Sequence, residues 1–234
     1  MKKIINIQIN QDILKIIAIL TMTLDHIGYI LTPSFEAPLR LIGRLSFPIF
    51  VFLMVFNLCQ KDLFTKYIQR LLTFAILTSL IIGPFKYTLN NILPLNIFWT
   101  LFLGMLTIYG IHETIHDFKD NKTRLILITY IIGIGALISF LTDYEFYGYL
   151  YILSMYGYLK TKNKIFGILS LIFGFLINLH ISITASLISY LTTFVFLLPL
   201  SKSEVVRRFL KPWWIFYAYY PIHLAILYAI KIYY

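Results

Sequence analysis

Residues 13–31 read ILKIIAILTMTLDHIGYIL, an apolar run whose charged or imidazole side chains are Lys15, Asp25 and His26. Nineteen residues are enough to cross the hydrocarbon core of a bilayer as one helix. Ionisable side chains inside such a helix are costly in lipid, so they usually face the protein interior and mark a pathway or a reaction site. The stretch therefore predicts a membrane helix with a functional face.

The spacing of two of these residues sharpens the prediction. Lys15 and His26 are eleven residues apart. At about 100° and 1.5 Å per residue, they fall on nearly the same helix face, about 16 Å apart along the axis. One face then carries a cation near the membrane surface and an imidazole deeper inside. This arrangement suits a ligand that has an anionic head and a long arm.

The composition extends the membrane prediction to the whole chain. Of 234 residues, 59% are hydrophobic and only 13% are charged, and the mean hydropathy is +0.81. A soluble domain of this length has too little interior to bury so much apolar surface. We therefore expect an all-α, polytopic membrane helical bundle. No linker or internal repeat is evident, so residues 1–234 are predicted to form a single domain. The first run is too long for a cleavable signal peptide.

Nine apolar segments are long enough to cross, or nearly cross, the bilayer core. Their approximate bounds are 13–31, 40–58, 66–82, 95–111, 124–141, 147–159, 165–179, 182–200 and 214–230.

The basic residues give these segments a direction. With the N-terminus inside, 16 of the 20 lysines and arginines fall on the cytoplasmic side. Such a bias predicts about nine transmembrane helices, N-in and C-out. It also accounts for the formal charge of +10 without a nucleic-acid partner. The cytoplasmic set is Lys2, Lys3, Lys15, Lys61, Lys66, Arg70, Lys119, Lys122, Arg124, Lys160, Lys162, Lys164, Lys202, Arg207, Arg208 and Lys211.

Two of the exceptions stand near the first helix. Arg40 and Arg44 are one turn apart, hence on one face, at the outer start of the second segment. Adjacent helical residues point about 100° apart, so Asp25 can pair with either arginine rather than with His26. We predict one buried charge cluster of Asp25, Arg40 and Arg44. It either docks two helices, with His26 merely hydrogen-bonded, or belongs to a site in which His26 is a general base.

Other ionisable or aromatic residues also gather toward the outer side. Asp143 and Tyr144 lie in a predicted outer loop, and Tyr220 and His223 lie in the last helix, where Pro221 breaks the hydrogen-bond ladder. Each of these residues is a candidate site residue, or else part of an interfacial aromatic belt or a structural histidine.

The stretch His112-Glu113-Thr114-Ile115-His116 indicates a different chemistry, because it fits H-E-x-x-H. In that motif two histidines one turn apart bind zinc and the glutamate acts as base. The motif lies at a helix end that runs into a charged stretch, and Glu204 is the main candidate for a third ligand. The alternatives are a zinc site and an exposed polar helix end.

Several blocks of sequence resemble one known family. They are Leu14-Lys15, Asp25-His26-Ile27-Gly28, Leu39-Arg40, Gly43-Arg44-Leu45, Phe47-Pro48, Tyr67, Arg70-Leu71, Asn96, Trp99-Thr100, Asp143-Tyr144, Tyr147-Gly148 and Phe216 through Leu224. In this order they resemble the TraX family. Phe56-Asn57 stands where many members have Glu-Gly.

The resemblance implies a chemistry. The namesake of the TraX family N-acetylates the pilin subunit of conjugative pili. The family is similar to the integral-membrane acyltransferases that have a basic residue, ten residues and then His in the first helix. Here that pattern is Lys15 to His26. It implies acetyl-CoA as the acyl donor, bound at Lys15, with His26, Asp25, Arg40 and Arg44 as catalytic residues. The expected partners are membrane lipid, an acyl-CoA, and a peptide, glycan or lipid acceptor of an acetyl group.

Two further functions stay open at this point. One is a membrane zinc metallopeptidase that uses His112, Glu113 and His116. The other is a non-enzymatic transporter or assembly scaffold, whose buried charges would line a translocation path.

Overall fold

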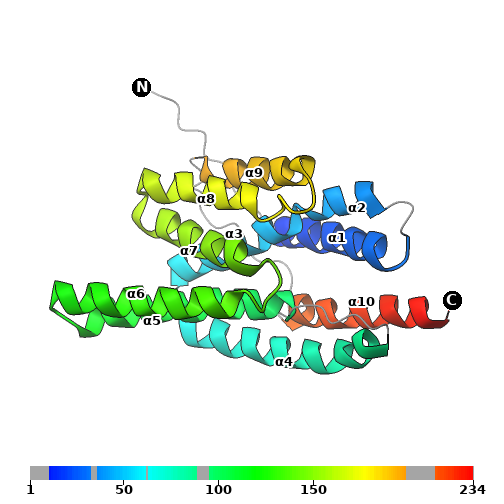
Figure 1. Ribbon diagram of the computed structural model, residues 1–234, viewed down its shortest axis with the longest axis horizontal. Coiled ribbons are helices and arrows are strands. Elements are labelled where there is room, and N and C mark those ends of the chain that lie inside the picture. The colour runs from blue at the N-terminus through cyan, green and yellow to red at the C-terminus, as the bar shows by residue number, and fades with distance from the viewer. Residues whose placement is uncertain (1–10, 33–35, 62, 89–94, 199–213, 234) are drawn as a thin grey trace. The chain divides into compact units, whose positions relative to one another are not determined.

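The protein is described by a computed structural model that places residues 11–32, 36–61, 63–88, 95–198 and 214–233 (Figure 1). These residues form α-helices. In chain order the helices are α1 (Gln11–Ile30), α2 (Glu36–Gly43), α3 (Ser46–Lys61), α4 (Phe64–Thr88), α5 (Ile97–Asp117), α6 (Asn121–Ser139), α7 (Glu145–Thr161), α8 (Lys164–Leu176), α9 (Ile183–Leu197) and α10 (Trp214–Tyr233).

The prediction of a helical membrane bundle is confirmed. Within the described residues, five stretches are long and apolar enough to cross a bilayer: α1, Ala37–Gln60, Phe64–Phe85, α6 and α10. The helices α8 and α9 are apolar but shorter. Leucine and isoleucine side chains are exposed along α6, at Leu125 (66%), Ile134 (56%) and Leu137 (73%). Such a face is stable in lipid and costly in water, so the chain is an integral membrane protein.

In the described part of the chain, each predicted apolar segment coincides with a helix, except that the second is divided into α2 and α3. The break falls at Arg44 and Leu45. Pro48 is the third residue of α3, within the first helical turn, where proline is tolerated because the N–H groups there have no acceptor inside the helix. Lys2, Lys3, Lys202, Glu204, Arg207, Arg208 and Lys211 lie outside the described residues.

Contacts between helices divide the chain into two compact units. Unit 1 comprises 1–54 and 174–234, and unit 2 comprises 55–173. Both boundaries fall inside helices, α3 and α8, rather than in linkers.

In unit 2, α5 packs against α4, α6 and α7. The buried Tyr149 of α7 ties three of these helices together. Its hydroxyl lies 3.1 Å from Thr107 Oγ1 of α5 and 3.1 Å from the carbonyl oxygen of Ile132 in α6. A side chain at Gly135 would overlap the Tyr149 hydroxyl, so glycine is required there for this approach.

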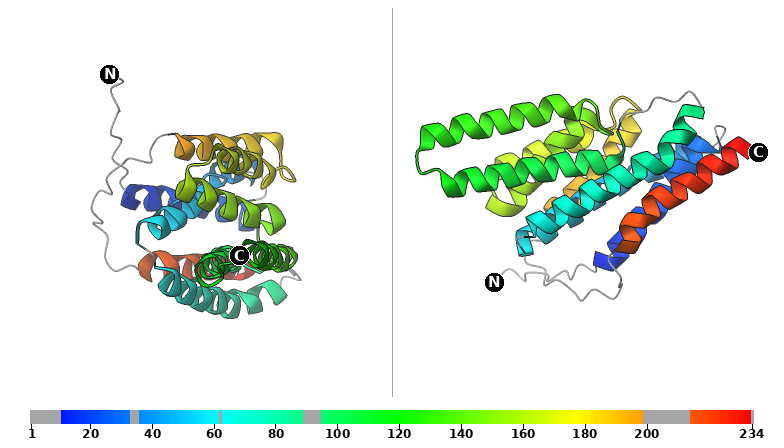
Figure 2. Two further views of the ribbon diagram at one scale, coloured as in Figure 1. Left: turned by 90° about the vertical axis from the view of Figure 1, so that its left-hand side faces the viewer. Right: turned by 90° about the horizontal axis from the view of Figure 1, so that it is seen from below.

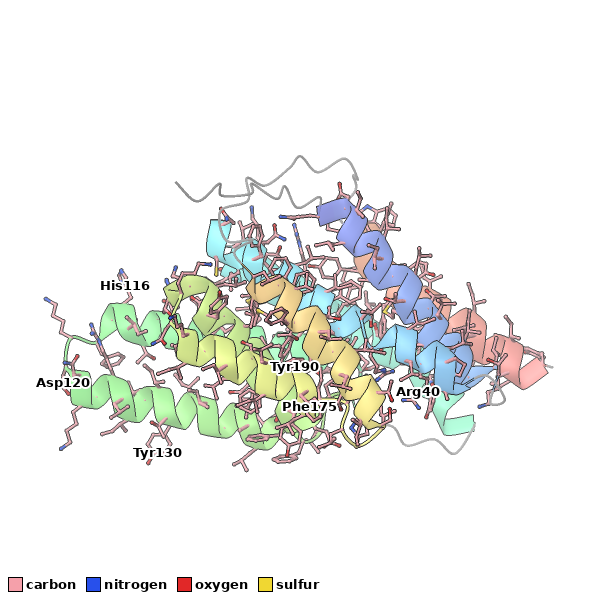
Figure 3. The ribbon with its side chains drawn as sticks, turned by 90° about the horizontal axis from the view of Figure 1, so that it is seen from above. Arg40, His116, Asp120, Tyr130, Phe175 and Tyr190 are labelled. Carbon is pink, nitrogen blue, oxygen red and sulfur yellow. The ribbon has the colours of Figure 1, made fainter. Side chains whose placement is uncertain are left out.

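The turn between α5 and α6 lies outside the apolar spans. Asp120 caps α6, because its carboxylate accepts hydrogen bonds from Thr123 Oγ1 (2.6 Å) and from the Thr123 N–H (2.7 Å). These two hydrogen bonds hold the pKa of Asp120 below its ordinary value. Figure 3 labels Asp120 and His116 at this end of the α5–α6 hairpin.

In unit 1, α1 packs against α2 and α10, and α2 packs against α9. The α1–α10 contacts pair Thr23 with Tyr219 and His26 with His223, so residue numbers rise together along both helices. The two helices therefore run parallel, as the right-hand view of Figure 2 shows. Two parallel spans require an odd number of crossings between them. The total number of crossings counted from α1 to α10 is then odd, as the N-in and C-out prediction demands.

The predicted topology assigns the turn after α6 and the turn before α8 to opposite sides of the membrane. Leu141 and Lys164 are exposed in these turns. In a Cys59→Ala background, Leu141→Cys should react with a membrane-impermeant maleimide in intact spheroplasts. Lys164→Cys should react only after permeabilisation, because lysine-rich turns stay in the cytoplasm. Labelling of both positions from one side would contradict the topology.

Candidate functional site

An ion-pair cluster joins α1 to α2 inside unit 1. The Asp25 carboxylate accepts a hydrogen bond from Arg44 Nη2, and Arg40 Nε lies 3.8 Å from the same carboxylate oxygen. The side chains of Asp25 and Arg44 are 15% and 5% exposed. The predicted cluster is confirmed, because all three charges meet between the two helices.

Arg44 is held by a second layer of polar groups. Its Nε donates to the carbonyl oxygen of Arg40 (3.0 Å), and its Nη1 donates to Asn178 Oδ1 (3.1 Å). Asn178 in turn donates to Ser189 Oγ of α9 (2.6 Å). Each of the three guanidinium nitrogens of Arg44 therefore has an acceptor, which fixes the plane of the group.

Pro48 completes this network from the backbone. Proline lacks the N–H that would bond the carbonyl four residues earlier, and that carbonyl belongs to Arg44. Ser189 Oγ donates to it instead, at 3.2 Å. The break between α2 and α3 is thus closed by a side chain from α9, so unit 1 holds Arg44 by both its side chain and its carbonyl.

Gly43 lets the two helices come this close. A Cβ atom at Gly43 would overlap the Cβ, Cγ and Oδ1 atoms of Asp25. The ion pair between Asp25 and Arg44 therefore depends on the absence of a side chain at Gly43.

Arg40 differs from Arg44 in exposure. Its side chain is 25% exposed, and its guanidinium carbon lies 5.1 Å from the centre of the Tyr29 ring. With Asp25 and Arg44 it forms a group of one carboxylate and two guanidiniums, so these three side chains carry one formal positive charge. Arg40 is the better placed arginine to meet an incoming anion, because Arg44 is buried and committed.

Lys15 lies near the start of α1, toward α10. Its ammonium group donates to Asp12 Oδ1 at 2.8 Å and lies 4.9 Å from the centre of the Phe216 ring. Asp12 is only 4% exposed. An ammonium has three donors, and Asp12 uses one of them. Because Lys15 and His26 both contact α10, their predicted common face on α1 is confirmed.

The structure brings together two histidines that the sequence placed at opposite ends of the chain. His26 Nδ1 lies 2.7 Å from His223 Nε2, and the rings stack with centres 5.0 Å apart. His223 Nδ1 lies 2.8 Å from the carbonyl oxygen of Tyr219, one turn earlier in α10. Tyr220 packs edge-on against His26, with ring centres 5.8 Å apart.

These contacts assign the protons when both rings are neutral. A carbonyl oxygen only accepts, so His223 Nδ1 carries a hydrogen and His223 Nε2 is an acceptor. His26 Nδ1 must then donate to His223. The lone pair of the neutral His26 ring therefore resides on Nε2. A general base needs such a lone pair in a fixed direction.

The remaining candidates lie in unit 2. Asp143 and Tyr144 form the turn before α7, where the Asp143 carbonyl accepts from Thr100 Oγ1 and Tyr144 adopts a left-handed conformation (φ 62°). They belong to unit 2, whereas Asp25, Arg40 and Arg44 belong to unit 1. Their role as site residues stays a prediction.

The H-E-x-x-H stretch occupies the end of α5. His112 Nδ1 lies 3.3 Å from Glu113 Oε1, and its ring packs against Phe64. His116 is 82% exposed. Within the described residues no group of three His, Cys, Asp or Glu side chains gathers there, and Glu204 lies outside them. The geometry gives the zinc alternative no support.

Sequence reasoning missed four groups of the site: Asp12, Asn178, Ser189 and the Tyr219 carbonyl. Asp12 could have been found, because it lies three residues before Lys15 on the same helix. Asn178 and Ser189 carry no such signal, since their partner Arg44 is more than 130 residues away.

A match to a family model shows which family the chain belongs to. The model described as "TraX protein" matches residues 10–231. The chain belongs to the TraX family.

The TraX-family chain also resembles one curated protein, "Uncharacterized protein RP591" of Rickettsia prowazekii (strain Madrid E). The two are 33% identical over 111 residues, which is 47% of this chain and 41% of that protein. No solved structure matches the chain significantly.

The contact at Gly43 predicts a specific sensitivity to a methyl group. Gly43→Ala should destabilise this TraX-family protein by about 1–3 kcal/mol, because the new Cβ must displace Asp25 or separate α1 from α2. Thermal unfolding in detergent measures the effect. Gly133→Ala is the matched control, because a Cβ there meets nothing within 4 Å. Equal midpoints for the two variants would contradict the close approach.

The Arg44 network predicts that charge alone is insufficient. Arg44→Lys keeps the cation, but one ammonium cannot reach Asp25, Asn178 and the Arg40 carbonyl in the same geometry. Each lost hydrogen bond to a charged group should cost about 1.5–3 kcal/mol. Thermal unfolding checks this against Arg124→Lys, where the exchanged arginine bonds one exposed carbonyl. The prediction is wrong if Arg44→Lys is as stable as that control.

Proposed function

We propose that this TraX-family protein is a membrane acyltransferase. It would move an acetyl group from cytoplasmic acetyl-CoA to an amine or hydroxyl of an extracytoplasmic or membrane-embedded acceptor, such as a pilin-like peptide. The observation that carries the proposal is the 2.7 Å contact of His26 Nδ1 with His223 Nε2, from which we infer that the lone pair of the neutral His26 ring lies on Nε2. His26 stands eleven residues after Lys15, on the same face of α1. The association of the family with pilin acetylation supports the choice of group.

In this proposal His26 is the general base. Its Nε2 takes the proton from the attacking amine or hydroxyl while the nitrogen or oxygen bonds to the thioester carbonyl carbon. The carbon–sulfur bond then breaks, and the CoA thiolate leaves and accepts the proton from His26. The acetyl group ends on the acceptor, and His26 returns to its neutral form.

Arg40 is the proposed partner of the negative charge that develops on the thioester oxygen. A cation aimed at such an oxygen stabilises the transition state more than the ground state. Its greater exposure than Arg44, 25% against 5%, favours it for this role. Asp25 and Arg44 would hold it from the α1 and α2 sides, so their effect on catalysis is through position.

Lys15 is the proposed contact for the anionic part of acetyl-CoA. It lies at the end of α1 that the topology assigns to the cytoplasm, where CoA phosphates would arrive. The distance of about 16 Å along α1 to His26 gives the pantetheine arm room to extend. Asp12 would orient the ammonium, and it also competes with the phosphates for it. The proposed location of the protein is the bacterial cytoplasmic membrane.

Two variants separate the proposed roles. His26→Ala should lower acetyl transfer by roughly 10²–10⁴-fold with little change in donor affinity, the range expected for loss of a general base. Lys15→Ala should chiefly weaken acetyl-CoA binding, and high salt should reduce that difference by screening the contact. The assay follows radiolabelled acetyl from acetyl-CoA into an envelope fraction, using purified protein in nanodiscs.

His116→Ala is the control, because it removes the second histidine of the H-E-x-x-H stretch. It should leave acetyl transfer unchanged. Wild-type transfer by His26→Ala, together with unchanged acetyl-CoA binding by Lys15→Ala, would refute the mechanism. Zinc that co-purifies in stoichiometric amount and is lost in the His116→Ala variant would instead favour the peptidase.

A further inference from the structure

The last helix carries a polar connection to α1 through His223, which takes up no proton in the acyl-transfer scheme above. His223 is 6% exposed and is the hydrogen-bond partner of His26. Its ring lies between two aromatic neighbours of its own helix. Tyr219 stacks on it with ring centres 4.9 Å apart, and Tyr220 meets it edge-on at 5.7 Å. Such packing leaves the imidazole little freedom to turn.

A second α1–α10 bond keeps the register of this contact. Thr23 Oγ1 lies 2.8 Å from the carbonyl oxygen of Ile19, to which it donates, and 2.8 Å from the Tyr219 hydroxyl. Since the Thr23 hydrogen is committed to Ile19, the Tyr219 hydroxyl donates to Thr23 Oγ1. Tyr219 therefore binds α1 through its hydroxyl and binds His223 through its carbonyl. The two histidines are aligned by a bond one turn away.

The direction of the hydrogen bonds has a chemical consequence. The Tyr219 carbonyl fixes a hydrogen on His223 Nδ1, so His223 Nε2 can only accept while the ring is neutral. His26 must then keep its own hydrogen on Nδ1. Without His223 the neutral His26 ring could place its hydrogen on either nitrogen, and the Nε2–H tautomer has no lone pair at Nε2.

We propose that His223 is a positioning residue that holds His26 in the Nδ1–H tautomer, with Nε2 directed toward the acceptor. This inference rests on the proposed acyl transfer. During the reaction an N–H or O–H bond of the acceptor breaks and an Nε2–H bond forms on His26. The resulting imidazolium keeps its Nδ1–H bond to His223, so the charge that appears on His26 meets a neutral acceptor. His223 itself gains and loses no proton.

A purely structural role makes a different prediction. If the His26–His223 bond only docks α10 on α1, its loss should lower stability and leave the chemistry of the surviving folded molecules unchanged. Tyr219→Phe provides the matched comparison, because it removes the Thr23 bond between the same helices and keeps the Tyr219 carbonyl. If both bonds only dock α10 on α1, loss of the His26–His223 bond and loss of the Thr23–Tyr219 bond should have equivalent effects.

The experiment compares His223→Leu, His223→Gln and Tyr219→Phe in the full-length protein. Glutamine keeps an acceptor oxygen near the place of Nε2, and leucine has none. For His223→Leu we expect kcat to fall by about 10²-fold, the loss associated with a small misplacement of a catalytic group, with the KM for acetyl-CoA unchanged. His223→Gln should recover most of kcat, and Tyr219→Phe should lower thermal stability more than kcat.

A second readout needs no substrate. With nitrogen-15 in the five histidines, the NMR signals of His26, assigned by their loss in His26→Gln, report which ring nitrogen carries hydrogen. Wild type should show a protonated Nδ1 and a bare Nε2, and His223→Leu should show a mixture of tautomers. A single Nδ1–H tautomer in His223→Leu would overturn the inference, and so would an unchanged kcat in that variant.

The two hypotheses fail in different ways. If His26→Ala stops transfer while His223→Leu keeps both kcat and tautomer, the positioning role is wrong and the acyltransferase proposal stands. If wild-type protein transfers no acetyl group but His223→Leu still shifts the His26 tautomer, the proposed function is wrong. The hydrogen-bond chain then remains as a device for a different reaction.

Discussion

The contact on which unit 1 depends is the ion pair between Asp25 and Arg44, formed where α1 and α2 meet at Gly43. Charges in an apolar span are tolerated only when they are paired and hydrogen-bonded, and removal of one partner typically costs about 3–5 kcal/mol. Here the pair is extended by Asn178 and by the carbonyl that Pro48 leaves open. In lipid, the burial of apolar side chains does not favour one helix pairing over another. The polar groups therefore select which helices pack together.

The same constraint gives the site its direction. The Asp25 carboxylate pairs with Arg44. It therefore faces α2 and points away from the neighbouring His26. His26 is then free to face α10, where it finds His223. Two adjacent residues of α1 thus serve two different helices, as the 100° step of the helix allows. The ion-paired Asp25 and the proposed general base, His26, are separated by one position in the chain.

Unit 2 is built differently. Several contacts between its helices are hydrogen bonds of neutral hydroxyl and amide side chains, such as Tyr149 with Thr107, and Asn96 Nδ2 with Ser79 Oγ (3.0 Å) and the Ala75 carbonyl (3.1 Å). These neutral bonds need no charge balance, so they hold helices at modest cost. The charged H-E-x-x-H stretch sits at a helix end, where His116 is exposed.

The sequence was sufficient for the properties that depend on local pattern. Apolar length predicted the helices, helical spacing placed Lys15 and His26 on one face, and the cost of charge in lipid predicted the pairing of Asp25 with Arg40 and Arg44. Motif blocks spread in order along the chain were enough to indicate the TraX family. Only the tertiary structure decided which residues meet across long separations. No period or spacing links Arg44 to Asn178 and Ser189, or His26 to His223, because those contacts depend on how α9 and α10 return to α1 and α2. The tautomer of His26 follows from the last of these contacts, since a proton on a ring nitrogen is set by the atom that faces it and not by its neighbours in the chain.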